Sequence, residues 1–166
     1  MLKSLVARLF GLDQELEGLR KEVKRLSHDD AFGILTRQGL MASCTTRSGK
    51  KAVVFLDFDR IGELNKELGY EEVNGRIKET FQQSIRHSDV LLGRWYSGDE
   101  CLVLVDGDTT AAEAVLDRLR MHAQGQGLSF MAATGPWDGK DEPLEHCVSR
   151  LAEEVLRQKA ERYQAA

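Results

Sequence analysis

The sequence contains few prolines, cysteines and aromatic residues and has little net charge, which excludes several classes of protein. Among 166 residues there are two prolines, three cysteines and 7% aromatic residues, and the net charge is −4. An odd cysteine count without a C-x-x-C pair argues against a disulfide framework and favours reduced thiols. The near balance of charges argues against broad electrostatic binding to DNA or to anionic membranes.

Long apolar runs and metal-ligand spacings are also lacking. No apolar run approaches the roughly 20 residues that a membrane-spanning helix needs, and the first residues lack the apolar stretch of a secretory signal. The four histidines are scattered and form no metal-ligand pattern. Apolar residues make up 42% of the chain, enough for a buried core. We therefore expect a cytoplasmic protein with neither a DNA partner nor a membrane partner.

The first 28 residues carry an unbroken heptad repeat. Its apolar positions are Leu2, Leu5, Leu9, Leu12, Leu16, Leu19, Val23 and Leu26. With Leu2 at position a, Arg8 and Asp13 occupy g and the following e, and Glu15 and Arg20 do the same with reversed signs. These pairs favour a parallel homodimer, so we expect residues 1–28 to be a coiled-coil dimerisation helix. The alternative is one amphipathic helix packed on its own domain, whose apolar stripe would drift toward a period of about 3.6.

Residues 29–166 alternate between strand-like and helix-like segments. Apolar runs predict strands at 53–56, 90–95, 101–105 and 129–134. Helical spacing predicts helices at 71–86, from 110 onward and at 143–163. The second of these helices would open with the capping-box pattern Thr110-Ala111-Ala112-Glu113. The short linker between the second and third strands predicts an antiparallel hairpin.

This order contains a central β-α-β-β-α-β unit. We expect an α/β (α+β) fold in which a ferredoxin-like, nucleotide-cyclase-like palm follows the N-terminal coiled-coil helix. The helices would pack on one face of the sheet. The run at 53–56 is continuously apolar, however, which is typical of a strand covered on both faces.

Two acidic pairs stand where neighbouring strands would bring them together. Asp57 and Asp59 follow the first strand, and Asp99 and Glu100 occupy the hairpin tip. Converging carboxylates repel one another and raise their pKa values, and Mg²⁺ would relieve that conflict. Bound ions of this kind can activate a hydroxyl group and stabilise a leaving pyrophosphate. The alternative is that these are ordinary solvated strand-end acids, and spacing alone leaves both open.

The motifs, taken in order, resemble the GGDEF domains of diguanylate cyclases, which join two GTP molecules into cyclic di-GMP across a dimer interface. Residues 57–65 resemble the motif D-I-D-x-F-K-x-I-N, and residues 94–101 (RWYSGDEC) resemble R-Y-G-G-D-E-F. Residues 29–40 are similar to the family's opening motif, and Lys159 to the lysine of A-L-Y-x-A-K. The resemblance identifies residues 29–166 as a GGDEF-like domain.

The resemblance also implies roles for individual residues. Asp57 and Glu100, with the carbonyl of Phe58, would hold Mg²⁺, and Asp99 and Glu100 would be the catalytic carboxylates. The substrate-binding residues would be Asn65, Asn74, Gly98, Lys159 and Arg162. In that set the asparagines would contact guanine, the glycine would let backbone approach phosphate, and the two cations would bind the terminal phosphates.

Arg86 and Asp89 match the family's inhibitory R-x-x-D site. The resemblance implies that they form an allosteric site for cyclic di-GMP, since arginine can bind guanine and phosphate bidentately. The alternative is an ordinary polar helix end.

The sequence departs from the family pattern at four positions. Gly62 replaces a phosphate-binding lysine, and Asn74 replaces the aspartate that reads guanine. Ser97 replaces the first signature glycine, and Cys101 the closing phenylalanine. Losing the cation and the charged acceptor would each cost about 2 kcal/mol or more of transition-state binding.

These observations predict a degenerate, dimeric GGDEF module of cyclic di-GMP signalling. It would bind GTP, or another guanine nucleotide, or cyclic di-GMP, with weak or no turnover. One alternative is an active diguanylate cyclase that uses Mg²⁺, which the retained carboxylates favour. The other is a coiled-coil interaction scaffold that binds no nucleotide. Whether the chain is an enzyme therefore stays open, as do the base preference and the input signal.

Overall fold

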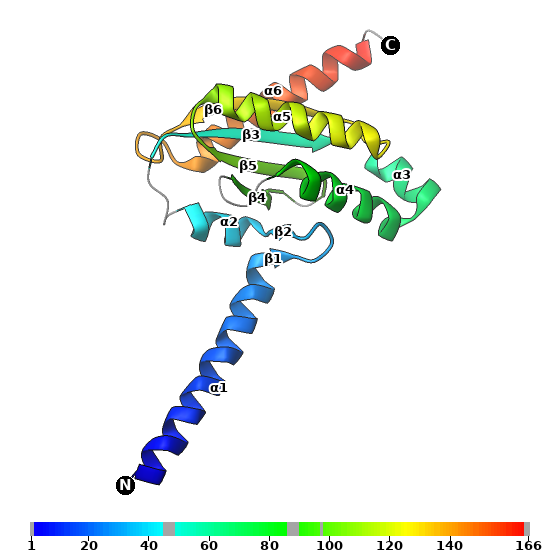
Figure 1. The fold of residues 1–166 in the computed structure, drawn as a ribbon. Helices are drawn as coiled ribbons and strands as arrows, with labels where there is room; N and C mark the ends of the chain where they lie inside the picture. Colours follow the sequence, from blue (N-terminus) through cyan, green and yellow to red (C-terminus); the bar gives the residue numbers. More distant parts are fainter. Residues whose placement is uncertain (1, 45–48, 86–89, 97, 165–166) are drawn as a thin grey trace.

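The structure, a computed structural model, describes residues 2–44, 49–85, 90–96 and 98–164. Figure 1 shows a long N-terminal helix that leads into a body built on one sheet. The helices are α1 (Leu2–Ser27), α2 (Arg37–Cys44), α3 (Ile61–Leu68), α4 (Tyr70–Ser84), α5 (Thr109–Gly125) and α6 (Leu144–Gln164). The strands are β1 (His28–Asp29), β2 (Ile34–Leu35), β3 (Lys51–Phe58), β4 (Val90–Arg94), β5 (Glu100–Asp106) and β6 (Phe130–Trp137).

The sheet has the strand order β1-β2-β4-β5-β3-β6. Strands β2 and β4 are parallel, and the other neighbouring pairs are antiparallel. The predicted α/β palm is confirmed, and β4 and β5 form the expected hairpin. Strand β3 lies between β5 and β6, so the residues at its C-terminal end reach two neighbouring strands.

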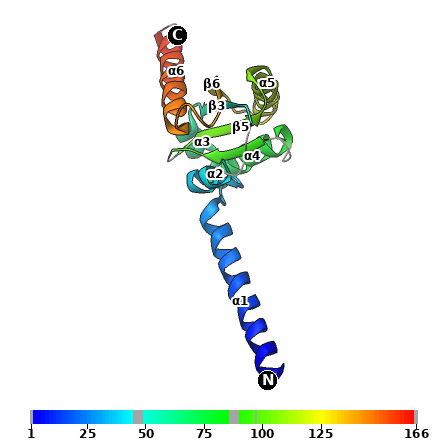
Figure 2. The ribbon, with the colours of Figure 1, turned by 90° about the vertical axis from the view of Figure 1, so that its left-hand side faces the viewer.

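Helices cover both faces of the sheet, so the expectation that they pack on one face is wrong. Helices α4 and α5 lie on one side and α2 and α6 on the other (Figure 2). Strand β3 supplies both cores because its side chains alternate. Val54 and Leu56 are buried with α4 and α5, whereas Val53 and Phe55 are buried with α2 and α6. The continuous apolar run at 53–56 thus reflects a strand with two covered faces.

The start of α5 also differs from the sequence expectation. The helix begins at Thr109, and Asp108 is its N-cap, with the carboxylate accepting the backbone N–H of Ala111 at 3.1 Å. The predicted capping box at Thr110 is therefore wrong, because Asp108 already satisfies that end of the helix. Helices α2 and α3 and the short strands β1 and β2 were not predicted.

Helix α1 extends away from the body (Figures 1 and 2). It meets the domain at its C-terminal end, where the Thr36 hydroxyl donates to the carbonyl of Leu26 at 2.9 Å. The apolar heptad positions from Leu12 to Leu26 are between 50% and 64% exposed. This stripe is not packed on its own domain, and its pairing with a second chain stays a prediction. Within the described residues, none of the helices has the length and apolarity needed to cross a bilayer.

Candidate functional site

The structure places Asp57 directly opposite Glu100. Strands β3 and β5 are antiparallel, and these two residues are register partners at the end of the ladder. The backbone N–H of Phe58 lies 3.5 Å from the carbonyl oxygen of Asp99, which ties the hairpin tip to the same end of β3. The two acidic pairs singled out in the sequence therefore meet at one end of the sheet.

The electrostatics of this end are unfavourable for negative charge. Burial raises the pKa of Glu100, and the charges of Asp57 and Asp99 add to the effect. Burial likewise raises the pKa of Asp99, with a further contribution from Asp57. Among the described residues, Oε2 of Glu100 is buried and has no hydrogen-bond donor. An unsatisfied buried carboxylate oxygen is costly, which makes it a natural ligand for a cation.

Two cationic side chains of α6 lie beside these carboxylates. The Lys159 ammonium is 2.7 Å from Oδ2 of Asp57 and 3.9 Å from Oδ1 of Asp59. The Arg162 guanidinium donates to Oδ2 of Asp59 at 2.9 Å. The Ser129 hydroxyl donates to the same oxygen at 3.0 Å. The carboxylate of Asp59 therefore accepts two hydrogen bonds, and the carboxylate of Asp57 is paired with the Lys159 ammonium.

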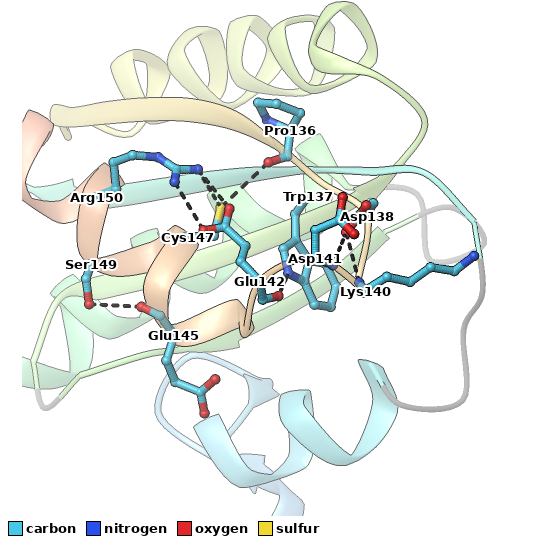
Figure 3. Close-up of polar contacts among 10 residues, drawn as sticks. All are labelled: Pro136, Trp137, Asp138, Lys140, Asp141, Glu142, Glu145, Cys147, Ser149 and Arg150. Atoms are coloured by element: carbon cyan, nitrogen blue, oxygen red, sulfur yellow. Dashed lines mark hydrogen bonds and ion pairs between the residues drawn. The ribbon is translucent and has the colours of Figure 1, made fainter.

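The position of α6 is set by the turn that follows β6 (Figure 3). The indole N–H of Trp137 donates to the carbonyl of Glu142 at 3.0 Å, and Oδ1 of Asp138 accepts two backbone N–H groups of the turn. Arg150 donates to both oxygens of the Glu142 carboxylate, at 3.0 and 3.1 Å. These bonds fix the start of the helix against the sheet. Lys159, further along the same helix, is thereby brought to the end of β3.

The remaining substrate-binding candidates lie on neighbouring elements. Asn65 is on α3 and is partly buried, and its Oδ1 has no donor among the described residues. Asn74 is partly buried on α4. Gly98 has a φ of 127°, in the region that favours glycine, and an added Cβ would lie 3.4 Å from Oε2 of Glu100. The Phe58 ring is in the core, so only its backbone can serve the site.

Sequence reasoning missed two contacts of the site, although Asp29 and Arg94 lie in motifs that it singled out. Ser129 reaches Asp59 only because β6 lies beside β3. Arg94 donates to Asp29 at 2.6 Å and lies over the Phe32 ring at 4.0 Å, and its charge lowers the pKa of Asp99 slightly against the larger effect of burial. The proposed allosteric pair, Arg86 and Asp89, lies outside the described residues.

The carboxylate pair can supply part of the ligand set of a divalent cation. Within the part of the chain that the structure describes, no three His, Cys, Asp or Glu side chains cluster closely enough to enclose a metal. Asp57 and Glu100 offer two hard oxygen ligands, one of which is unsatisfied. Mg²⁺ commonly uses one or two carboxylates together with water and substrate phosphates. The residues therefore fit an ion held jointly with a nucleotide.

Solved structures with the same fold are GGDEF domains. Diguanylate cyclase SiaD of Pseudomonas aeruginosa, solved with its activator SiaC, matches with a TM-score of 0.66 and 22% identity over 96% of this chain and 68% of that chain. The coiled coil and GGDEF domain of DgcB from Caulobacter crescentus, in complex with cyclic di-GMP, matches with a TM-score of 0.69 and 15% identity over 95% of each chain. A microbial GGDEF domain, solved with cyclic di-GMP, matches with a TM-score of 0.69 and 18% identity over 82% of this chain and 94% of that chain.

The chain thus has the fold of a GGDEF domain. No protein-family model matches the sequence, and no curated protein matches it either. The likeness therefore rests on three-dimensional arrangement. Since the DgcB match leaves out only a small part of this chain, it also includes most of α1.

Proposed function

We propose that this chain is a dimeric, degenerate GGDEF-like domain of cyclic di-GMP signalling, which binds GTP or cyclic di-GMP with weak or no turnover. The observation that carries the proposal is the register pairing of Asp57 with Glu100, whose Oε2 is buried and takes no donor among the described residues. Mg²⁺ bound with nucleotide would satisfy this oxygen and relieve the repulsion between the carboxylates. The resemblance of the motifs and the shared fold both support this assignment.

The groups that the resemblance assigns to the site would suit a guanine nucleotide. Lys159 and Arg162 lie within ion-pair distance of the acidic cluster and would supply positive charge for terminal phosphates. Asn65 carries a buried acceptor without a donor, and the N–H groups of guanine could satisfy it. The positive φ at Gly98 favours glycine, whose missing side chain would let a phosphate approach the hairpin backbone.

The proposal of weak turnover rests on Gly62 and Asn74. Apart from its chain neighbours and its own helix backbone, a Cβ built on Gly62 would meet none of the described residues within 4 Å, so there is room for the family's lysine where this chain has no side chain. Asn74 offers an amide where the family offers a carboxylate. Both changes weaken charge-assisted contacts to the nucleotide. The retained Asp57, Asp99 and Glu100 favour the second candidate, an active diguanylate cyclase that requires Mg²⁺.

The dimer part of the proposal rests on α1. Its exposed stripe keeps a heptad period, and apolar side chains of this size gain free energy when a second helix covers them. A cyclic dinucleotide is assembled from two nucleotides, so a dimer would bring one site from each chain. The DgcB structure matched above pairs the same domain with a coiled coil.

Product analysis separates the candidates. We expect the purified chain, incubated with GTP and Mg²⁺ and examined by chromatography, to yield no more than a trace of cyclic di-GMP. Substantial product that disappears in Glu100→Gln would establish the active cyclase instead. If product is absent, calorimetry with GTP and with cyclic di-GMP should show binding that Asn65→Ala weakens. Absence of binding to both ligands would leave a scaffold.

A gain-of-function variant tests the missing cation. We expect Gly62→Lys to tighten GTP binding about tenfold, equivalent to about 1.4 kcal/mol. Gly75→Lys on α4 is the matched control, because it is also an exposed helical glycine with no atom near the added Cβ. Both variants gain similar helix propensity and the same charge. Equal effects on GTP affinity would show that the position of Gly62 has no special relation to phosphate.

A further inference from the structure

Strand β6 forms one edge of the sheet. Among the described residues it pairs with β3 on one side, and no strand lies on its other side. The free side of an edge strand carries backbone N–H and C=O groups that can pair with another chain. The β6 edge of the sheet is separated from the hairpin β4–β5 by strand β3.

The register of β6 identifies the groups on its free side. The backbone N–H of Asp59 donates to the carbonyl of Ser129 at 2.8 Å, so this pair continues the β3–β6 ladder as a hydrogen-bonded pair. In an antiparallel ladder such pairs alternate with pairs whose backbone groups point away. The residues of β6 whose backbone N–H and C=O groups point away from β3 are therefore Phe130, Ala132 and Thr134. They are called the outward-facing residues below. Pro136 is next in this series, and its missing N–H would have faced outward.

The free side of β6 lies at the bottom of a groove. A cavity of about 540 Å³ is lined by Ala132, Ala133 and Thr134 of β6 and by side chains of α5 and α6. Figure 2 shows α5 and α6 on opposite sides of this edge, so the strand lies between two helical walls. Leu116 of α5 and Leu151 of α6 line the two walls, and each is about 5% exposed at the floor of the groove.

The groove suits a single strand better than a second copy of this sheet. The edge of a second copy would bring its own α5 and α6, which would meet the same helices across the groove. A lone extended segment has no such helices and presents side chains alternately to the two walls. The polar lining carries the carboxylates of Glu113, Asp117 and Glu154. Arg120 lies 3.5 Å from Asp117 and Arg157 donates to Glu154, so the groove keeps an excess of one negative charge.

From these observations we infer that β6 accepts an extended, basic peptide segment of a partner protein, which joins the sheet as an added strand. Its backbone would pair with the N–H and C=O groups of Ala132 and Thr134. Its alternating apolar side chains would contact Leu116 or Leu151, and its lysine or arginine side chains would meet the acidic rims. This surface is separate from the carboxylate site, so the inference stands without the proposed nucleotide function.

A designed probe tests the inference with the full chain. The probe is a fluorescent peptide of about eight residues with alternating valine and lysine, long enough to span the outward-facing residues. Two further peptides carry N-methyl groups, one on all valines and the other on all lysines. Only one of these two sets can face β6, so we expect one methylated peptide to bind like the parent and the other at least tenfold more weakly. A valine–glutamate peptide is expected to bind at least tenfold more weakly as well.

The protein side of the test uses Thr134→Pro, which removes an outward-facing N–H, and Thr134→Ser, which keeps it. We expect Thr134→Pro to weaken the parent peptide at least tenfold and Thr134→Ser to leave the affinity within twofold. Amide exchange of Ala132 and Thr134 in the wild type should slow when the peptide is added. The inference is overturned if no parent peptide binds at millimolar concentration, or if both methylated peptides bind equally. Protection of amides elsewhere would overturn it too.

Discussion

Replacing Glu100 with glutamine should stabilise the metal-free protein near neutral pH. Glu100 faces Asp57 across the ladder, and its pKa is raised by burial and then by the charges of Asp57 and Asp99. One carboxylate oxygen is buried without a donor among the described residues. Glutamine has nearly the same shape, removes the charge and can donate its amide N–H toward Asp57. The same change should remove a ligand from the proposed cation site.

The size of the effect follows from the cost of a buried unsatisfied group. That cost is about 1–3 kcal/mol, and partial exposure of the site reduces it to about 1 kcal/mol. For a chain of this length, such a gain raises Tm by about 2–4 °C. Burial raises the pKa of Glu100 above its usual 4.5 in the folded state, so the penalty is complete only above that raised pKa. It shrinks as pH falls through the raised pKa and is gone below the usual value, because the protonated carboxyl group then carries no charge in either state.

Thermal denaturation followed by circular dichroism, in EDTA and at fixed protein concentration, measures the difference. Glu113→Gln, on the exposed side of α5, is the control and should leave Tm unchanged. Adding Mg²⁺ with GTP should raise the Tm of the wild type and leave Glu100→Gln much less affected, since a ligand stabilises only the state that binds it. The reasoning is refuted if Glu100→Gln lowers Tm in EDTA near neutral pH, or if the difference does not shrink on acidification.

Three other substitutions test parts of the fold. Gly39→Ala should destabilise the domain by about 2 kcal/mol or more in denaturant titrations, because its Cβ would lie 2.2 Å from the backbone oxygen of Ser27. Asp106→Asn should cost about 2 kcal/mol by the same measurement, because the buried Lys51 ammonium would lose its carboxylate partner at 2.9 Å. If α1 pairs as proposed, the wild type should be a dimer in light scattering and Leu19→Glu a monomer; a dimer that persists in the variant would contradict the proposed coiled coil.

The sheet was largely predictable because its main strands coincide with short, continuous apolar runs in the sequence. The run at 53–56 is buried throughout, and the hairpin linker between β4 and β5 is short. Helix α3 gave no such signal, since none of its residues is buried and it starts after Arg60, whose φ is 57°. Helix α2 is held close to α1 at Gly39, a tertiary contact with no local pattern. The second helical layer was missed because the motif alone suggested helices on one face.

The meeting of the acidic clusters was predictable from topology, whereas their partners were not. Once β3 and β5 are neighbours, Asp57 and Glu100 share one end of the sheet. The ion pair between Lys159 and Asp57 depends on where α6 crosses the sheet, and that position is set by bonds such as the one from Trp137 to Glu142. Family resemblance named Lys159 as a phosphate ligand, and only the structure shows that it lies against a carboxylate.

The central claim is that Asp57 and Glu100 form one site for a divalent cation bound with nucleotide. Paramagnetic broadening by Mn²⁺ in backbone amide NMR spectra tests it most directly. With GTP present, trace Mn²⁺ should broaden the amides of residues 57–59 and 98–101 first, and Glu100→Gln should abolish this pattern. Uniform broadening, or broadening centred on another part of the sheet, would contradict the claim.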